Sequence, residues 1–498
     1  MKRVFVLFLF STLAMNFLAA CGDTGKQTAD ESTDSLVENV SESTEKLKSN
    51  RREVDFDNYV FRIITRDDTN TTTWRVIDVV DSEENIGDSI NDAVYKRNMA
   101  VSEEYNITFE RIATIHEQIV ATVSKLVLAG DDTFDALQTI LTHQSQLSSE
   151  GYLHNLDKFD DLKLAEPWWD SIGNDFLRIG GTLYSAMGDI NIIDNDATYS
   201  VLFNKNLIAN YPVIPDIYQL VRDGKWTLDK LHEYAQLVSK DLDGNGVMEW
   251  DKDQFGVIDQ YEVSEALLLG SGMRAVKFDK DGYLEYNLNN EKISDTFEKV
   301  YELFSDDTCQ ITTDAAKYSS VADKWNVISR GTFKSDRGLF FIGPTVNVRL
   351  MRDMTSDFGI IPIPKIEESQ ETYHSMLQSN NATSYSIPIS VSDPDRSALI
   401  LEALAEESVD TLTPAYYENT LKRKASRDSE SADMLDLIFA NRIIDQADTY
   451  VTIGIKSFIE GQAAAKSNTF ASSEASKRAS FIEKIDKVNE AFKKLKDN

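Results

Sequence analysis

Residues 202–256 read LFNKNLIANYPVIPDIYQLVRDGKWTLDKLHEYAQLVSKDLDGNGVMEWDKDQFG, and this stretch indicates the fold more clearly than any other part of the chain. It starts with an apolar, strand-like run, which passes through a turn-prone Asn-Lys-Asn into a loop that contains two prolines. A helix is expected next, with Thr227 as its N-cap. Apolar residues recur along it at helical spacing, at Leu228, Leu231, Ala235 and Val238. The helix is expected to end at Lys240, before an acidic loop and a second strand.

Three segments of this stretch, in their order and spacing, resemble the extracellular solute-binding proteins of ABC importers, the large family that includes the maltose-binding protein. The helix start departs from the family pattern, because Trp226 and Thr227 stand in reversed order and no proline comes just before them. The three segments are Phe203-Asn-Lys-Asn-Leu207, Lys225-Trp-Thr-Leu-Asp-Lys-Leu231 and Gln254-Phe-Gly256. Further similar segments extend the resemblance over nearly the whole chain after the N-terminal region: 150–156, 181–189, 338–344 and 358–364.

The residues before this stretch independently predict a parallel α/β layer, in which strands alternate with helices. Strand-like runs lie at 59–65, 107–109 and 134–140, and helical apolar patterns lie between them at 86–105 and 119–128. Ligands of such sheets bind beyond the carboxyl ends of the strands.

The resemblance implies the rest of the architecture. It predicts an α/β, two-lobed periplasmic-binding-protein-like fold of type II, in which each lobe is a mainly parallel sheet flanked by helices and a hinge joins the lobes. Residues 55–196 and 358–449 are then expected in the first lobe, and residues 197–357 and 450–498 in the second.

The N-terminal residues predict export and a lipid anchor. Two basic residues precede an apolar run at 4–17, and Leu18-Ala-Ala-Cys21 resembles a bacterial lipobox, in which Cys21 receives the lipid. An ordinary secretory signal that contains a cysteine is the alternative. Residues 22–54 are rich in Ser, Thr, Glu, Asp and Lys, which predicts a disordered tether between a signal segment at 1–21 and the folded body.

The charge of the chain excludes two classes of ligand. Its 498 residues carry a formal net charge of −32, which repels nucleic acid and anionic lipid head groups. The only cysteine besides Cys21 is Cys309, which is expected to be a small core residue.

The acidic loop after residue 240 predicts a structural calcium site. Oxygen-bearing side chains alternate along it, and Gly246 permits the tight turn that such loops need. Lys252 occupies the twelfth position of the loop and cannot bind a cation, so the next residue, Asp253, is expected to complete the coordination sphere of the calcium ion. The alternative is that the loop is a simple turn without a bound ion. The expected ligands are Asp241, Asp243, Asn245, Val247 and Asp253.

Candidate ligand-binding residues are aromatic or follow predicted strand ends. Trp168 and Trp169 can offer an apolar ring face to the C–H groups of a sugar, and we expect one of them to be exposed and the other buried. The other candidates are Arg66, Asp67, Gln144, Asp189, Asn191, Asp259, Tyr261, Thr345 and Asn347. Thr345 stands where many sugar-binding members of the family have an aromatic residue.

These features predict a lipid-anchored, extracytoplasmic receptor rather than an enzyme. Its expected ligand is a carbohydrate, with an oligosaccharide favoured by the resemblance, and its expected partner is an ABC permease; the chain is expected to be a monomer with no catalytic cofactor. The chain has no His-Glu-x-x-His, Cys-x-x-Cys or Gly-x-Ser-x-Gly motif. Two alternatives remain at this point: a surface lipoprotein enzyme acting on polysaccharide, and a sensory co-receptor.

Overall fold

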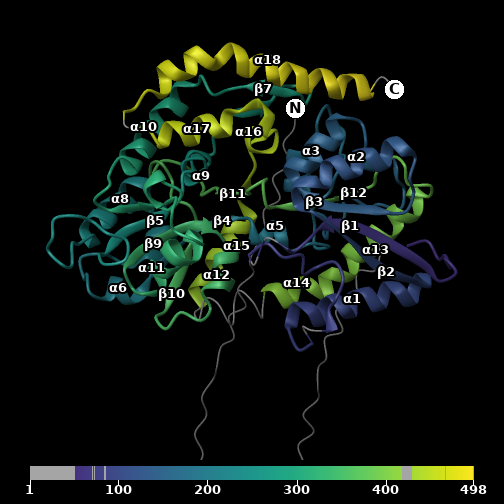
Figure 1. Ribbon diagram of the computed structural model, residues 1–498, viewed down its shortest axis with the longest axis horizontal. Coiled ribbons are helices and arrows are strands. Elements are labelled where there is room, and N and C mark those ends of the chain that lie inside the picture. Colours follow the sequence, from purple (N-terminus) through teal and green to yellow (C-terminus); the bar gives the residue numbers. More distant parts are fainter. Residues whose placement is uncertain are drawn as a thin grey trace, which may run out of the picture. The chain divides into compact units, whose positions relative to one another are not determined.

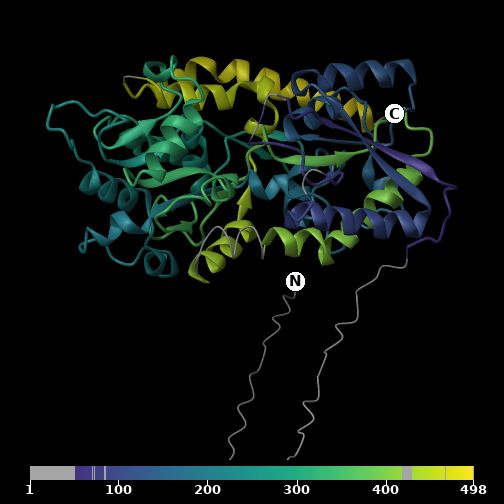
Figure 2. The same ribbon diagram turned by 60° about the horizontal axis from the view of Figure 1, so that its bottom comes forward.

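The computed structural model describes residues 51–69, 71, 73–83, 86–417, 429–465 and 467–496. The signal segment, the lipid attachment at Cys21 and most of the tether therefore lie outside the described residues. Figures 1 and 2 show two α/β lobes, one built around purple and blue segments and the other around teal segments. The last residues assigned to the tether belong to the body, because Arg51 pairs with Glu104 on one helix and Glu407 on another.

The first lobe contains a four-stranded sheet with the order β12-β3-β1-β2. The strands β1 (Tyr59–Arg66), β2 (Ile107–Thr114) and β3 (Ala136–Ile140) run parallel, and β12 (Thr383–Ser386) pairs antiparallel with β3. The predicted alternation of strand and helix is confirmed. The helices of this lobe include α1 (Ser89–Tyr105), α2 (Ile119–Ala129), α3 (Leu141–Ser149), α4 (Ser171–Leu177) and α13 (Pro394–Asp410).

The second lobe contains a five-stranded sheet with the order β10-β4-β9-β5-β8. This sheet is mixed, because β5 pairs parallel with β8 and β9, whereas β4 pairs antiparallel with β9 and β10. The strands are β4 (Tyr199–Asn204), β5 (Phe255–Asp259), β8 (Gln310–Thr312), β9 (Gly338–Pro344) and β10 (Phe358–Ile361). The helices packed around them include α6 (Lys205–Ala209), α7 (Ile217–Arg222), α8 (Leu228–Val238), α9 (Val263–Gly270), α10 (Glu291–Phe304), α11 (Gly331–Lys334) and α12 (Val346–Leu350).

The stretch that indicates the fold lies in the second lobe, as predicted. Thr227 caps α8 by accepting a hydrogen bond from the Lys230 N–H, and the predicted apolar face of α8 is buried. Gly256 lets α8 lie directly on β5, because a Cβ atom at this position would come within 2.2 Å of the Ala235 Cα. Trp226 is fully buried and donates to the Pro362 carbonyl, and Cys309 is likewise in the core.

The boundary between the lobes differs from the prediction in the middle of the chain. Residues 358–449 were expected in the first lobe, but β10 lies in the second sheet and α15 (Ser429–Ala440) packs on β10. The chain returns to the first sheet only at β12, after β11 (Ser375–Met376), which pairs with β13 (Arg442–Ile443). The apolar run of β10 suits either sheet, and its long-range pairing with β4 decides between them.

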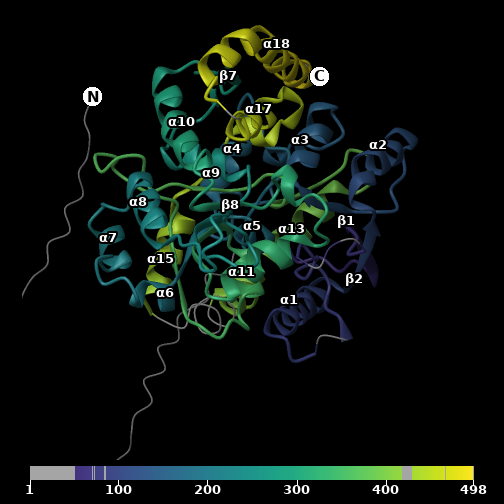
Figure 3. The ribbon, with the colours of Figure 1, turned by 60° about the vertical axis from the view of Figure 1, so that its left-hand side comes forward.

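The C-terminal residues form helices that close the second lobe, as predicted. Helices α17 (Ile455–Ala463) and α18 (Phe470–Lys496) pack with α10, and Figure 3 shows α18 beside α17 and β7 (Leu284–Tyr286). The end of α18 also reaches the first lobe, where the Phe492 ring contacts Tyr184. Within the described residues, no helix combines the length and apolar character that crossing a membrane requires.

Candidate functional site

A cavity of about 320 Å³ lies between the two lobes. Its first-lobe wall is the loop after β1, and most of its second-lobe wall comes from β5, β9, α12 and the π-helical turn η5 (Trp325–Arg330). The volume falls within the range of about 300–1,000 Å³ that small-molecule sites usually have. The residues that carry its chemistry are Trp74, Asp259, Gln260, Asp323, Trp325, Asn326, Arg330, Asn347, Gln378 and Asn381.

The topology of the two sheets explains why these residues meet. Three strands, β1, β5 and β9, end with their carboxyl ends toward the cavity, so the residues that follow each strand line its wall. Asp259 is the last residue of β5, and Asn347 lies in α12 directly after β9. A crevice at the carboxyl ends of strands is the usual ligand position in open α/β sheets.

Two indole rings face the cavity from opposite lobes. Trp74 comes from the first lobe and rests against the apolar cluster that contains Leu141 and Leu377. Trp325 comes from the second lobe, is 38% exposed and carries the Lys324 ammonium over its ring at 4.9 Å. Exposed indole faces suit ligands with apolar C–H patches, such as the pyranose rings of sugars.

Asp259 lies on the cavity wall, and one of its carboxyl oxygens is buried without a hydrogen-bond partner among the described residues. Its side chain is buried, its Oδ2 accepts a hydrogen bond of 2.5 Å from Gln310, and its Oδ1 has no hydrogen-bond partner among the described residues. Burial raises the pKa of Asp259 well above its usual value, and the nearby Asp314 charge adds to this effect. The environment therefore favours the protonated carboxyl, which can donate to or accept from a hydroxyl group.

Two of the sequence candidates, Asp259 and Asn347, lie on the cavity wall. The tryptophan prediction is wrong, because Trp168 and Trp169 are each only 3% exposed, so neither is open to solvent. Their indole N–H groups donate to the two carboxylate oxygens of Glu402 on α13, at 2.9 and 2.8 Å. This pair therefore holds the core of the first lobe together.

Three other candidates are occupied in buried packing. Gln144 donates to the Ser384 carbonyl, and Asn191 donates to the Thr383 carbonyl. Thr345 donates to the Asn195 carbonyl at 2.5 Å. These bonds occupy the three side chains, and none of the three lines the cavity.

The remaining four candidates lie outside the lining of the cavity: Arg66, Asp67, Asp189 and Tyr261. Asp67 accepts a hydrogen bond from Thr69, and the Tyr261 ring stacks on Phe304. Burial raises the pKa of Asp189 to about 6 and lowers that of Arg66.

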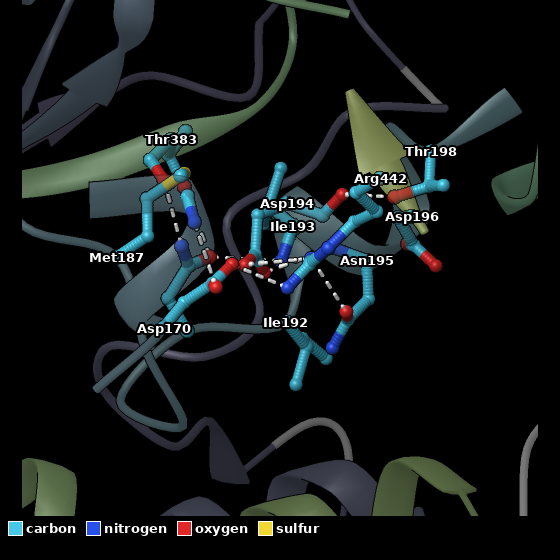
Figure 4. Close-up of polar contacts among 12 residues, drawn as sticks. Asp170, Met187, Ile192, Ile193, Asp194, Asn195, Asp196, Thr198, Thr383 and Arg442 are labelled. Carbon is cyan, nitrogen blue, oxygen red and sulfur yellow. Dashed lines mark hydrogen bonds and ion pairs between the residues drawn. The ribbon is translucent and has the colours of Figure 1, made fainter. Parts of the chain in front are cut away.

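A buried polar cluster holds the crossing between the lobes (Figure 4). It is centred on Arg442 of β13, which donates to Asp170 at 2.5 Å, to Asp194 at 3.3 Å and to Asn195 at 3.0 Å. Asp194 and Asn195 belong to the short crossing helix α5 (Ile193–Asp196), whereas Asp170 caps α4 in the first lobe. Burial raises the pKa of Asp194 to about 7 although Arg442 lowers it.

The acidic loop brings three of the predicted metal ligands together. One carboxylate oxygen each of Asp241, Asp243 and Asp253 lies within 4.8 Å of the others. Asp253 is buried and accepts from two backbone N–H groups, whereas the Lys252 ammonium pairs with Glu249 at 2.6 Å and with Asp243 at 3.9 Å. An all-oxygen donor set of this kind fits a hard cation such as calcium.

Sequence reasoning missed both indoles of the cavity. Trp74 could have been predicted as a cavity residue, because it lies in the loop after the first predicted strand, where a ligand would be expected. Trp325 could not, since the residues before it form an irregular segment that follows no predicted strand.

No protein-family model matches the chain, and no curated protein sequence matches it. Solved structures match it over nearly their whole length. A cyclo/maltodextrin-binding protein complexed with maltotetraose has 14% identity and a TM-score of 0.57, and the match covers 86% of this chain and 97% of that chain. The cyclic alpha-maltosyl-1,6-maltose binding protein from Arthrobacter globiformis has 13% identity and a TM-score of 0.55, covering 89% and 100%.

An ABC substrate-binding protein from Listeria monocytogenes in complex with cycloalternan has 11% identity and a TM-score of 0.53, with 89% of this chain and 99% of that chain covered. At these identities the likeness establishes the fold. The chain has the two-lobed, periplasmic-binding-protein-like fold, and these three neighbours are binding proteins rather than enzymes.

Proposed function

We propose that this chain, which has the fold of the substrate-binding components of ABC importers, captures a carbohydrate between its lobes and delivers it to a membrane permease. The observation that carries the proposal is the cavity between the lobes, to which each lobe contributes one indole ring, Trp74 and Trp325. The amide and carboxyl side chains beside them on the cavity wall are of the kinds that bind hydroxyl groups. An oligosaccharide, whose further residues extend out of the cavity, is the ligand class that we favour.

The capture mechanism follows from the two-sided lining. A ligand that contacts Trp74 on one lobe and Trp325 on the other has more contacts when the lobes are close together than when they are apart. Its differential affinity therefore favours the closed state, and closure removes water from the polar groups of the cavity. The permease can then distinguish loaded from empty protein by the relative position of the lobes.

A thermal-shift screen of the full chain in detergent, against mono- and oligosaccharides, tests the proposal. One or more sugars should raise the melting temperature and be recovered unchanged, whereas consumption of the sugar would favour an enzyme. The W325A variant should keep the melting temperature of the unliganded protein and lose most of the sugar-dependent shift. An equal shift in W325A would contradict the assignment of the site.

Delivery to a permease is tested in cells. Cells that lack this chain should lose uptake of the labelled sugar, and the restored chain should return it. Normal uptake together with a lost transcriptional response to the sugar would support sensing instead of transport.

We also propose that Cys21 is lipidated and anchors the protein at the outer face of the cell membrane. The small residues Ala19 and Ala20 before this cysteine support the proposal. The C21S variant should appear in the culture medium instead of the membrane fraction, and intact mass should show acyl chains on the wild type only. Equal membrane retention of both proteins would contradict the anchor.

A structural calcium ion in the acidic loop is a third proposal, supported by the convergence of Asp241, Asp243 and Asp253. Asn245 and the Val247 carbonyl are the further ligands that the loop offers. The ion would hold the loop between α8 and β5 and supply no chemistry in the cavity. Calcium binding should be visible by calorimetry on chelator-treated protein, and its absence there would contradict the site.

A further inference from the structure

We infer that the carbohydrate captured in the cavity carries an anionic group, a uronate carboxylate, which binds to the guanidinium of Arg330. This inference rests on the proposed function and specifies its ligand class. It follows from a buried positive charge on the cavity wall that the protein itself does not neutralise.

Arg330 is 8% exposed, and its hydrogen bonds go to neutral partners. Its Nε donates to the Asn326 side-chain oxygen at 2.8 Å, and its Nη1 donates to the Asn347 side-chain oxygen at 3.0 Å. The second terminal nitrogen, Nη2, donates to no described residue, and no described carboxylate forms an ion pair with this guanidinium. Burial therefore lowers the pKa of Arg330 below its usual value.

Other buried or partly buried arginines of the described chain are compensated differently. Arg349 pairs with Asp196 at 2.7 Å, and Arg442 pairs with Asp170 and Asp194. Arg97, which is fully buried in the first lobe, donates to three backbone carbonyls and to Asn98, and so has no free direction. Arg330 combines burial, neutral partners and a position on the wall of a cavity.

A buried charge without a counter-ion costs free energy, and a ligand that supplies the counter-ion recovers that cost on binding. The two bonds to Asn326 and Asn347 fix the plane of the guanidinium, so that Nη2 is oriented before the ligand arrives. A carboxylate is the group that suits this donor best, because it accepts charge-assisted hydrogen bonds from guanidinium N–H groups.

The surroundings of Arg330 are consistent with an anionic sugar rather than a free anion. Trp325 lies one turn before it in η5, so a pyranose ring stacked on this indole brings its substituents near the guanidinium. The charge of Asp323 raises the pKa of Arg330 and so offsets part of the effect of burial, but Asp323 accepts a hydrogen bond from the Asn326 amide at 2.6 Å and forms no ion pair with Arg330. With a net charge of −32, the protein as a whole repels anions, so selection of one requires a dedicated cation.

The test compares matched ligands on the full chain in detergent by titration calorimetry. The probes are the trisaccharides of galacturonate, mannuronate and glucuronate, their methyl esters, and neutral maltotriose, cellotriose and mannotriose. At least one uronate should bind about 10- to 100-fold more tightly than its methyl ester, the range expected for a hydrogen bond to a charged group. This comparison needs no variant.

Variants then assign the effect to one side chain. R330Q should remove the preference for the uronate over its ester, and R330K should retain part of it, because the charge remains and the planar fork is lost. R352Q is the matched control, since Arg352 is exposed, lies outside this cavity, and the substitution changes the net charge equally. R352Q should bind like the wild type.

Three outcomes would overturn the inference. If neutral trisaccharides bind and uronates do not, the inference fails while the proposed function stands. If a uronate and its ester bind equally, or if R330Q keeps the preference for the uronate over its ester, Arg330 does not bind the carboxylate. If no saccharide of either class binds, the proposed function fails together with the inference.

Discussion

Substitution of Trp169 by Phe separates a structural role of the Trp168–Trp169 pair from a role in ligand contact. In the wild type the Trp169 indole N–H donates to the Glu402 Oε2 at 2.8 Å, and the ring is 3% exposed. W169F keeps a buried aromatic ring but removes this donor and part of the packed area. The variant should therefore lose stability and retain sugar binding.

The magnitude follows from what is removed. A hydrogen bond to a charged acceptor contributes about 1.5–3 kcal/mol, and the smaller ring leaves a void that adds about 1 kcal/mol, so the expected loss is about 2.5–4 kcal/mol. Glu402 keeps its bonds from Trp168 and from the Lys163 backbone N–H. Burial already raises the pKa of Glu402, and the bond from Trp169 opposes this rise, so its removal raises the pKa further.

When the pKa of a carboxyl group is higher in the folded than in the unfolded state, the free energy of unfolding falls as pH increases from the unfolded-state pKa toward the folded-state pKa. The difference in free energy of unfolding between the wild type and W169F should therefore be larger at pH 8 than at pH 5, and urea denaturation at both pH values measures this difference. Sugar affinity by calorimetry should stay within about threefold of the wild type, a difference of less than 1 kcal/mol. Unchanged stability together with weakened sugar binding would refute the structural role, and W325A, with the opposite behaviour, is the control.

Three further predictions concern the loop, the crossing and the helix contact. Calcium at a hundredfold excess over its Kd should raise the free energy of unfolding by about 2.7 kcal/mol, and D241N should abolish this gain in a chelator-controlled melt. The free energy of unfolding of the wild type should fall by up to about 4 kcal/mol between pH 4 and 7, because the buried Asp194, whose pKa burial raises to about 7, ionises in this range. D194N should not show this fall, and equal pH profiles of the two proteins would contradict the prediction. G256V should destabilise the second lobe by about 3 kcal/mol or more because its Cβ would overlap Ala235 on α8, and denaturant midpoints equal to those of the wild type would rule out that contact.

Local patterns in the sequence predict the elements well. The cap at Thr227 and the apolar spacing of α8 depend on residues within one helix, so they can be read directly. The position of β10 depends on pairing with β4, which lies about 150 residues earlier, and an apolar run carries no mark of its partner strand. The boundary of the lobes was therefore misplaced although the strand was recognised.

The candidate site was predictable only where strand ends mark it. Asp259 follows a readable strand, so its place on the cavity wall could be anticipated. The burial of Trp168 depends on Glu402, more than 230 residues later, which accepts from its indole. Trp325 follows an irregular segment, and nothing near it in sequence distinguishes it from a core tryptophan.

Capture of a sugar between the lobes is tested by a calorimetric titration of the wild type and of W325A with the sugar that gives the largest thermal shift. The wild type should bind it at one site and release it unchanged, and W325A should bind at least about 30-fold more weakly, the cost of about 2 kcal/mol typical of a tryptophan anchor. Equal affinity of the two proteins would place the sugar outside the cavity between the lobes and contradict the proposed function.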